Sequence, residues 1–243
     1  MDCCNAYESE SMREALGETL RPGGFDLTER GVQYCGLSAR SRVLDLGCGR
    51  GATVRFLYET HRIRACGADP SEMLIGEAKQ KCPYAEFALA KGEELPFAER
   101  RFDCVFAECT LSLMDVPRAL RQVSRVLDSR GWFVVSDVYA RNSAAAEGLN
   151  GFAFRSCMRG LHDLALLQTQ LEAAGFETIC FEDCSAYLRE LLVKITFAYG
   201  SMSAFWNASS QDCADGCRFH EALRACKPGY FMLIARKAED RNG

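Results

Sequence analysis

The sequence predicts an α/β fold: a doubly wound, seven-stranded, mostly parallel sheet with helices on both faces. Short apolar runs of strand length alternate with amphipathic segments of helical length along most of the chain. Three glycines at alternate positions, Gly47, Gly49 and Gly51, directly follow the first of these runs. A chain of 243 residues is long enough for one large domain, or for a domain with a small cap.

Seven segments are short and apolar enough to be buried strands: residues 42–47, 63–69, 85–91, 102–108, 130–138, 176–183 and 229–237. Helices are predicted at 1–20, 27–35, 52–60, 71–82, 116–127, 161–175 and 185–206. Ser71 is a predicted N-cap, Pro117 lies in a first helical turn, and Gly175 ends a helix. About 45 residues separate the last two strands, longer than usual connections, so an insertion is expected there.

Composition excludes several classes of protein. Hydrophobic residues make up 48% of the chain and charged residues 26%, which are ordinary globular values. The net charge of −4 argues against a nucleic-acid partner. The amino terminus lacks a signal-peptide pattern, and the apolar runs are too short to span a membrane. Several of the 14 cysteines lie within apolar runs, so we expect reduced thiols and a cytoplasmic protein.

The glycine-rich loop points to a ligand that approaches the backbone. It lies after a strand and before a helix, where parallel sheets bind their ligands. Asp69 follows Gly49 by about 20 residues and ends the second strand, where an acid can accept hydrogen bonds from ribose hydroxyls. The letters GCGRGA fit both the Gly-x-Gly-x-x-Ala pattern of dinucleotide sites and a Gly-x-Gly-x-Gly pattern. The glycines alone therefore leave the cofactor open.

Four stretches in chain order carry a family resemblance: VLDLGCGRG, GADPSEMLIGEAK, EELPFAERRFDCVFAE and ALRQVSRVLDSRGWFVVSD. They resemble the class I S-adenosylmethionine-dependent methyltransferases, and in particular the small-molecule branch similar to enzymes of ubiquinone and menaquinone biosynthesis. The resemblance covers residues 42–138 well, and 161–183 and 229–237 more loosely. It implies S-adenosylmethionine as methyl donor, S-adenosylhomocysteine as product, a small-molecule acceptor and an antiparallel last strand. A monomer or homodimer is expected.

The same resemblance divides the single domain into a helical lid, a cofactor-binding core and a helical substrate cap made of two insertions. The predicted bounds are 1–40 for the lid, 41–138 for the core, and 139–160 and 184–228 for the cap. The cap is rich in aromatic residues, which either bury its helices or suit a planar acceptor: Phe152, Phe154, Tyr187, Phe197, Tyr199, Phe205 and Trp206.

The resemblance also implies roles for single residues in the first two strands and the segments after them. Asp45 would organise the methionine amino group, often through water, and Asp69 would bind the ribose. Pro70 and Met73 would pack against the adenine. For Cys48 the backbone is expected to bind while the thiol packs nearby. The loop beneath the methionine and ribose would comprise Gly47, Cys48, Gly49 and Gly51.

The third and fourth strands supply the remaining cofactor residues that the resemblance implies. Lys91 stands where the family often has an aspartate that accepts a hydrogen bond from the adenine amino group. Lysine cannot accept a hydrogen bond, so Gly92 or Glu93 is expected to make this contact instead. Glu108 and Cys109 end the fourth strand, beside the transferring methyl group in relatives.

Methyl transfer is an in-line displacement at a sulfonium, so the enzyme must mainly align the reactants and exclude water. A base is needed only if the nucleophile must lose a proton, and no catalytic residue is dictated. The candidate bases are Glu108, His162, His220 and Tyr139. Cofactor contact, helix capping and packing are the competing roles for these side chains. Arg21 is expected either to pair with the cofactor carboxylate or to lie in a solvated loop.

The cysteines leave one further possibility open. Four soft ligands stand close together at Cys213, Cys217, His220 and Cys226, but their spacing is not that of a standard zinc finger, so no metal is expected. Together with Cys3, Cys4, Cys109 and Cys157, they are compatible with a thiol- or metalloid-directed methyltransferase, such as one acting on arsenite. A dinucleotide-dependent oxidoreductase and a cofactor-binding regulator without catalysis are also compatible with the sequence.

Overall fold

The computed structural model describes residues 6–8, 17, 19, 21–153, 155–210 and 215–239. They form the predicted seven-stranded sheet, in the order β3-β2-β1-β4-β5-β7-β6. β7 is antiparallel to both neighbours and the other pairs are parallel, which confirms the expected last strand. The strands are β1 Val43–Leu46, β2 Ala65–Asp69, β3 Phe87–Leu89, β4 Phe102–Glu108, β5 Leu127–Ala140, β6 Phe176–Asp183 and β7 Pro228–Lys237.

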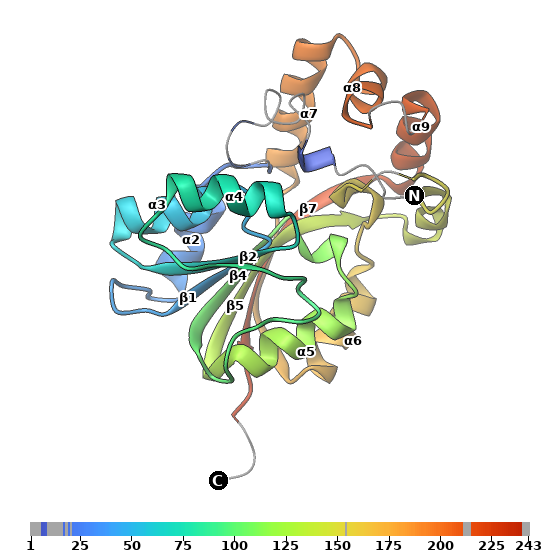
Figure 1. Ribbon diagram of the computed structural model, residues 1–243. Coiled ribbons are helices and arrows are strands. Elements are labelled where there is room, and N and C mark those ends of the chain that lie inside the picture. The colour runs from blue at the N-terminus through green and yellow to red at the C-terminus, as the bar shows by residue number, and fades with distance from the viewer. Residues whose placement is uncertain are drawn as a thin grey trace.

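Helices cover both faces of the sheet, and a group of them forms a cap beyond its carboxyl edge (Figure 1). α2, α3 and α4 lie on one face, and α5 and α6 lie on the other. α7, α8 and α9 form the cap. The α-helices are α2 Asp26–Tyr34, α3 Ala52–His61, α4 Glu72–Lys81, α5 Val116–Val126, α6 Leu164–Ala173, α7 Ser185–Tyr199, α8 Met202–Ser209 and α9 Gly216–Cys226. The 3₁₀ helices are η1 Ala6–Glu8, η2 Leu111–Leu113, η3 Ser143–Leu149 and η4 Cys157–Arg159.

Apolar periodicity and capping residues account for these elements. All four residues of β1 are buried, as expected for a strand covered on both faces. Ser71 accepts a hydrogen bond from the amide of Leu74, and Asp163 accepts from the amides of Ala165 and Leu166. These caps satisfy the free amides of a first helical turn and fix where each helix begins.

The structure differs from the predicted elements in several places. α9 (Gly216–Cys226) was not predicted, and β3 comprises only Phe87–Leu89 of the strand predicted over 85–91. The helix predicted over 185–206 is two helices, because Gly200 takes a left-handed φ of 75° and ends α7. The helix predicted over 161–175 begins at Leu164, because Asp163 caps it. β5 is longer at both ends than the strand predicted over 130–138. The helix predicted over 1–20 falls largely outside the described residues, of which 6–8 form η1.

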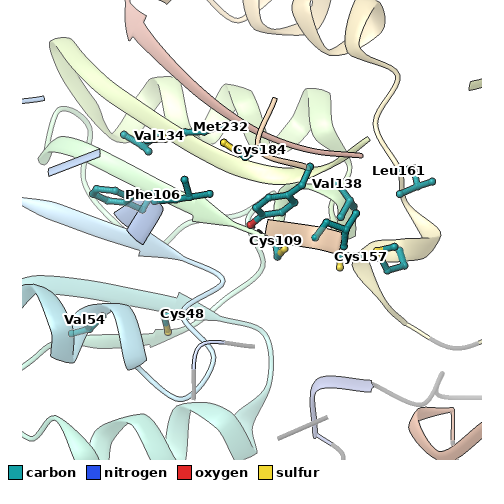
Figure 2. Close-up of a cluster of buried hydrophobic side chains, with 14 of the residues drawn as sticks. Cys48, Val54, Phe106, Cys109, Val134, Val138, Cys157, Leu161, Cys184 and Met232 are labelled. Atoms are coloured by element: carbon teal, nitrogen blue, oxygen red, sulfur yellow. Dashed lines mark hydrogen bonds between the residues drawn. The ribbon is translucent and has the colours of Figure 1, made fainter. Parts of the chain in front are cut away.

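Two apolar clusters hold the helices to the sheet, one on each face. Figure 2 shows part of the first, in which Val54 of α3 and Phe106, Val134 and Met232 of the sheet lie between the strands and their covering layer. This cluster continues into the cap, where the ring of Trp206 lies 4.9 Å from that of Phe219. The cap is therefore packed onto the sheet.

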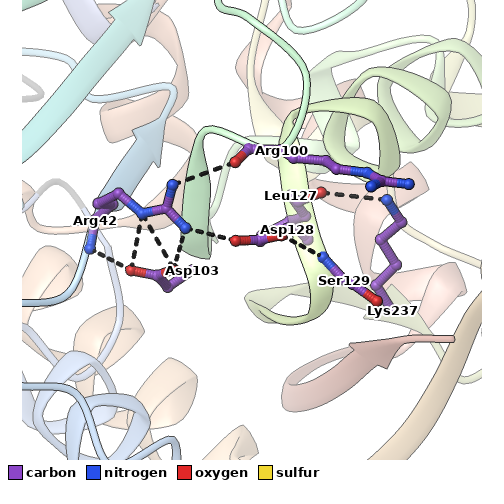
Figure 3. Close-up of polar contacts among 7 residues, drawn as sticks. All are labelled: Arg42, Arg100, Asp103, Leu127, Asp128, Ser129 and Lys237. Atoms are coloured by element: carbon purple, nitrogen blue, oxygen red, sulfur yellow. Dashed lines mark hydrogen bonds and ion pairs between the residues drawn. The ribbon is translucent and has the colours of Figure 1, made fainter. Parts of the chain in front are cut away.

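The amino ends of the central strands are joined by polar contacts on the side of the sheet opposite the cap. The Arg42 guanidinium, before β1, donates to Asp103 of β4 and to Asp128 of β5 at 2.5 and 2.7 Å (Figure 3). These hydrogen bonds raise the pKa of Arg42 above its ordinary value. All three side chains are exposed, so the network adds little to the free energy of unfolding.

Candidate functional site

A cleft of about 890 Å³, open to solvent, lies at the carboxyl ends of β1, β2 and β4. Parallel sheets bind ligands at this edge. All the predicted cofactor residues except Gly51 and Met73 line it: Asp45, Gly47, Cys48, Gly49, Asp69, Pro70, Lys91, Gly92, Glu93, Glu108 and Cys109.

The three loop glycines adopt left-handed conformations, but their surroundings differ. A Cβ atom on Gly47, whose φ is 79°, would lie 2.3 Å from Cγ2 of Thr110. A Cβ on Gly49, whose φ is 50°, would meet nothing within 4 Å and would stand in the cleft. Gly51, with φ 77°, is the N-cap residue of α3. Its amide donates to the Cys48 carbonyl at 2.9 Å. Gly47 is thus required by packing, whereas Gly49 keeps space open for a ligand.

Four of the five amides in the loop, those of Gly47, Cys48, Gly49 and Gly51, already have protein acceptors. Gly47 and Cys48 both donate to the carbonyl of Ala68, at 2.8 and 3.1 Å. Gly49 donates to Oδ2 of Asp69 at 3.0 Å. A phosphate-binding loop instead turns its free amides towards the anion. This loop therefore provides a surface against which a ligand can pack, and it does not form an anion-binding site.

The Cys48 thiol packs against β2 beneath the loop. A Cβ atom on Gly67 would lie 2.7 Å from the Cys48 sulfur, so Gly67 makes room for it. Burial and the nearby carboxylates of Asp45 and Asp69 raise the pKa of this thiol well above its ordinary value. It therefore stays protonated and unreactive at neutral pH.

Asp69 ends β2 and braces the loop above it. Its Oδ1 accepts from the amide of Ser71 at 2.9 Å, and its Oδ2 accepts from Gly49. Each carboxylate oxygen has a further lone pair for a ligand hydroxyl. Burial raises the pKa of Asp69, while the two backbone amides oppose this change.

Glu108 ends β4, and its carboxylate is surrounded by two hydroxyl groups and one guanidinium group. Its Oε1 accepts from the Thr28 hydroxyl at 2.8 Å, and its Oε2 accepts from the Thr53 hydroxyl at 3.1 Å. Arg21 lies 3.0 Å from Oε2 and also donates to Thr28 at 2.7 Å. The network joins β4 to α2, α3 and the segment before α2. Glu108 thus serves as an anchor for Arg21, which pairs with it inside the protein.

Asp45 lies within β1, and its carboxylate borders the cleft. Burial and the neighbouring Glu108 raise its pKa to about 8, and Arg21 offsets part of this rise. Within the described ranges no hydrogen bond or ion pair reaches its carboxylate. A buried acid of this kind is stabilised by a cation brought in by a ligand.

A second hollow, which we call the apolar chamber, lies beneath the cap and holds about 450 Å³ of free space, part of it open to solvent. Tyr7 and Cys109 line both the chamber and the cleft, so the two spaces meet there. Figure 2 shows Cys109 and Cys157 at this junction, away from Cys48. The residues around the chamber are Tyr7, Pro22, Cys109, Val138, Ser156, Cys157, Met158, Leu188, Leu191, Leu192, Ile195, Met202, Phe205 and Trp206.

η1 lies between the cleft and the chamber and is held to both the core and the cap. The Tyr7 carbonyl accepts from Arg50 at 3.2 Å, and the Tyr7 hydroxyl accepts from the amide of Cys157 at 3.0 Å. Glu8 accepts from the Ser71 hydroxyl at 2.8 Å. The amino-terminal segment therefore contributes directly to the walls of the site.

Comparison with known proteins identifies the family. Residues 44–135 match the family described as "Methyltransferase domain", and this segment runs from β1 into β5, so it contains most of the cleft. This segment of the chain therefore carries a methyltransferase domain.

Curated relatives match different shares of this chain. The 27-O-demethylrifamycin SV methyltransferase of Amycolatopsis mediterranei (strain S699) is 27% identical over 91% of the chain and 86% of its own length. Phosphoethanolamine N-methyltransferase 1 of Triticum aestivum is 31% identical over 66% of the chain, which spans only 33% of that protein. The methyltransferase GfsG of Streptomyces halstedii is 26% identical, and 66% of it is covered.

Solved structures share the fold of this chain. The [4+2]-cyclase SpnF superposes with a TM-score of 0.72 at 20% identity, covering 98% of each chain. Haemonchus contortus phosphoethanolamine N-methyltransferase 2, in complex with S-adenosyl-L-methionine, gives a TM-score of 0.75 at 16% identity, covering 94% of this chain and 56% of that one. A cyclase among them illustrates that function must be argued from the site.

At the predicted adenine end of the methyltransferase cleft, the structure corrects one residue. Met73 does not line the cleft and is 45% exposed, whereas Leu74 is buried and lines it together with Pro70. Successive residues of a helix point about 100° apart, and α4 turns Leu74 towards the sheet. Lys91 is exposed at the rim, and Glu93 accepts from the amide of Asp115 at 2.8 Å.

Of the four candidate bases, only Glu108 lines the cleft. The Tyr139 hydroxyl donates to Asp183, at the end of β6, at 3.0 Å. His162 precedes α6 and lies 3.4 Å from Asp137, with which it is buried. His220 lies on α9 in the cap, where burial lowers its pKa. His162, His220 and Tyr139 line neither the cleft nor the apolar chamber.

The late cysteine cluster of the methyltransferase does not gather into a described metal site. Cys217 is exposed on α9, while Cys226 is buried and donates to the carbonyl of Ala222 at 3.3 Å. Cys213, like Cys3, Cys4 and Phe154, lies outside the described residues. Among the residues that are described, no group of three or more His, Cys, Asp or Glu side chains could hold a metal ion.

In the same part of the chain, no helix combines the length and apolarity needed to cross a membrane.

Sequence reasoning missed several residues of the methyltransferase site. Tyr7 is the only aromatic residue among the first 20, a signal that could have singled it out. Thr53 lies two residues after Gly51, on the turn of α3 that faces the strand ends. Its place near the site could therefore also have been predicted from the sequence. Arg155 lines the cleft from the cap, and nothing in its local sequence indicates this.

Proposed function

We propose that S-adenosylmethionine binds in the cleft and that the protein transfers its methyl group to a small-molecule acceptor. The observation that carries the proposal is the buried carboxylate of Asp45, which borders the cleft beside Glu108 and forms no hydrogen bond or ion pair with a described residue. The bound cofactor supplies an activated methyl group on a positively charged sulfur. The methionine amino group is the cation that Asp45 is suited to receive.

A dinucleotide suits this cleft less well. Its diphosphate needs free amides or cations near the loop. The amides of Gly47, Cys48 and Gly49 already have protein acceptors, and Arg21, a cation of the cleft, is paired with Glu108. Asp69 lies beside the same loop, and its carboxylate would repel a diphosphate. The surroundings of the loop therefore favour a cationic ligand over an anionic one.

The proposed contacts follow from the lining of the cleft. Asp69 would accept from the ribose hydroxyls while it holds Gly49 in place. Pro70 and Leu74 would pack against the adenine, and Lys91, Gly92 and Glu93 would border it. A monomeric or homodimeric state and a cytoplasmic location stay predictions from the sequence.

Calorimetry with S-adenosylhomocysteine and with NADH tests the cofactor. We expect S-adenosylhomocysteine to bind at one site per chain and NADH to give no saturable heat. Turnover of S-adenosylmethionine against a panel of acceptors then tests the reaction. Saturable NADH binding without binding of S-adenosylhomocysteine would overturn the proposal.

Binding of S-adenosylhomocysteine is expected to depend on pH through Asp45. In the free protein its pKa of about 8 keeps it mostly protonated at neutral pH, and a bound ammonium lowers that pKa. Binding therefore releases a proton, and between about pH 6 and 7.5 the affinity rises by up to about tenfold per unit. Calorimetry in two buffers with different ionisation heats measures the released proton.

The matched control for this pH dependence is Asp45→Asn, which keeps the shape of the side chain but cannot titrate. Its affinity for S-adenosylhomocysteine should be lower and flat across the same pH range. Proton uptake by the wild-type protein on binding, or an unchanged slope in the variant, would contradict the assignment.

Without ligand, the raised pKa means that the contribution of Asp45 to stability is present at low pH and is lost as the pH rises towards 8.

A further inference from the structure

We propose that the acceptor is a neutral, largely apolar molecule that occupies the apolar chamber and presents its reacting atom between Tyr7 and Cys109. The inference rests on the proposed function, because it assigns the second substrate of the same site. Its support comes from the lining of the chamber, from the place where the two spaces meet, and from the positions of the charged side chains.

The chamber is walled by aliphatic, aromatic and sulfur-containing side chains. Leu188, Leu191 and Ile195 follow one another at helical spacing on α7 and form a continuous apolar stripe. Met202 and Phe205 of α8 continue the wall. An apolar ligand is favoured in such a space because its surface leaves water without losing hydrogen bonds.

Three polar side chains at the edge of the chamber, those of Ser156, Tyr7 and Cys109, already have protein partners. The Ser156 hydroxyl accepts from the amide of Met158 at 3.3 Å, and the Tyr7 hydroxyl accepts from the amide of Cys157. The Cys109 thiol lies 3.5 Å from the hydroxyl of Tyr230. Among the described residues that line the chamber, none carries a formal charge. A charged acceptor placed there would lose its water without gaining a counter-ion.

The cations of the site lie in the cleft instead. Arg21 and Arg155 line the cleft, where Arg21 is bound to Glu108 and Arg155 lowers the pKa of Asp69. Neither is part of the chamber lining. A phosphorylated acceptor, such as the one named for the relatives from Triticum aestivum, would therefore find no cation in the chamber.

The junction between the spaces lies at a strained turn. Cys109 directly follows β4 with a φ of 57°, which is uncommon for a residue with a side chain, and its amide donates to the Ser136 carbonyl at 2.7 Å. This turn places Cys109 on the walls of both spaces, as Tyr7 also is. An acceptor in the chamber therefore lies next to the cleft, at the two side chains that the spaces share.

The test uses 2-naphthol, a neutral fused-ring probe whose fluorescence reports its surroundings, titrated into the full chain saturated with S-adenosylhomocysteine. We expect saturable binding that phosphoethanolamine does not displace. Ile195→Trp fills the chamber and should weaken 2-naphthol binding at least about tenfold, since it removes the buried contact of the ring. Leu191→Trp is a second variant with the same expected effect at a less buried position of the wall.

Val193→Trp is the matched control, because Val193 lies on the same helix but is 54% exposed and faces away from the chamber. It should bind 2-naphthol like the wild type. Affinity for S-adenosylhomocysteine, measured in parallel, should be unchanged in all three variants, which also establishes that they are folded. If the wild type fails to bind S-adenosylhomocysteine, the proposed function fails. If it binds that ligand but not 2-naphthol, if both chamber variants bind 2-naphthol normally, or if phosphoethanolamine displaces the probe, the inference is overturned.

Discussion

Replacing Asp69 with alanine is expected to weaken binding of S-adenosylhomocysteine at least about 100-fold, since hydrogen bonds to a charged group contribute about 1.5–3 kcal/mol each. The side chain has two tasks that alanine cannot perform. It accepts from the amides of Gly49 and Ser71, which fixes the loop against the end of β2. It also has the lone pairs that we assign to the ribose hydroxyls. Calorimetry with purified protein measures the change in affinity.

Two further variants separate these tasks from a general loss of negative charge. Asp69→Asn keeps one acceptor oxygen and should fall between the wild type and Asp69→Ala. Glu72→Ala removes a nearby but exposed carboxylate from the first turn of α4 and should bind S-adenosylhomocysteine normally. Wild-type affinity in Asp69→Ala would show that the ribose contact has been assigned to the wrong residue.

The second large effect is expected on the free energy of unfolding. Gly47→Ala should lower it by about 3 kcal/mol, because alanine at a positive φ is strained and a misplaced methyl group adds overpacking. The added Cβ would lie 2.3 Å from Cγ2 of Thr110, whose hydroxyl is tied to the Leu46 carbonyl at 2.7 Å. Thr110 therefore cannot easily move aside. Equilibrium unfolding in urea measures the loss.

Gly49→Ala provides the comparison within the same loop. It has the strain of a positive φ but no clash, so a loss of only about 1 kcal/mol is expected. Its methyl group would stand in the cleft, so it should weaken S-adenosylhomocysteine binding more than it lowers stability. Equal destabilisation by the two substitutions would contradict the distinction between a packing glycine and a ligand-facing glycine.

Local patterns in the sequence were sufficient for most of the fold. Strand and helix periods depend on neighbours a few residues apart, and the cap at Ser71 acts within a single turn. Gly47 and Gly49 lie where a backbone turn needs a positive φ, which few other residues tolerate. The antiparallel direction of β7, in contrast, was implied by the family resemblance and not by any local pattern.

What only the tertiary structure decided depends on residues far apart in the chain. Met73 and Leu74 are both apolar neighbours on α4, and only the packing of that helix on the sheet turns Leu74 into the cleft. Glu108 meets Thr28 across 80 positions of sequence, so its role as an anchor for Arg21 cannot be read locally. The sequence by itself determined most of the elements, the glycine loop and the place of Asp69 at the end of β2, because these depend on short-range chemistry, whereas the role of Asp45 was implied by the family resemblance. The apolar chamber exists only after η1, β4 and the cap come together, because its walls belong to segments that no local interaction joins.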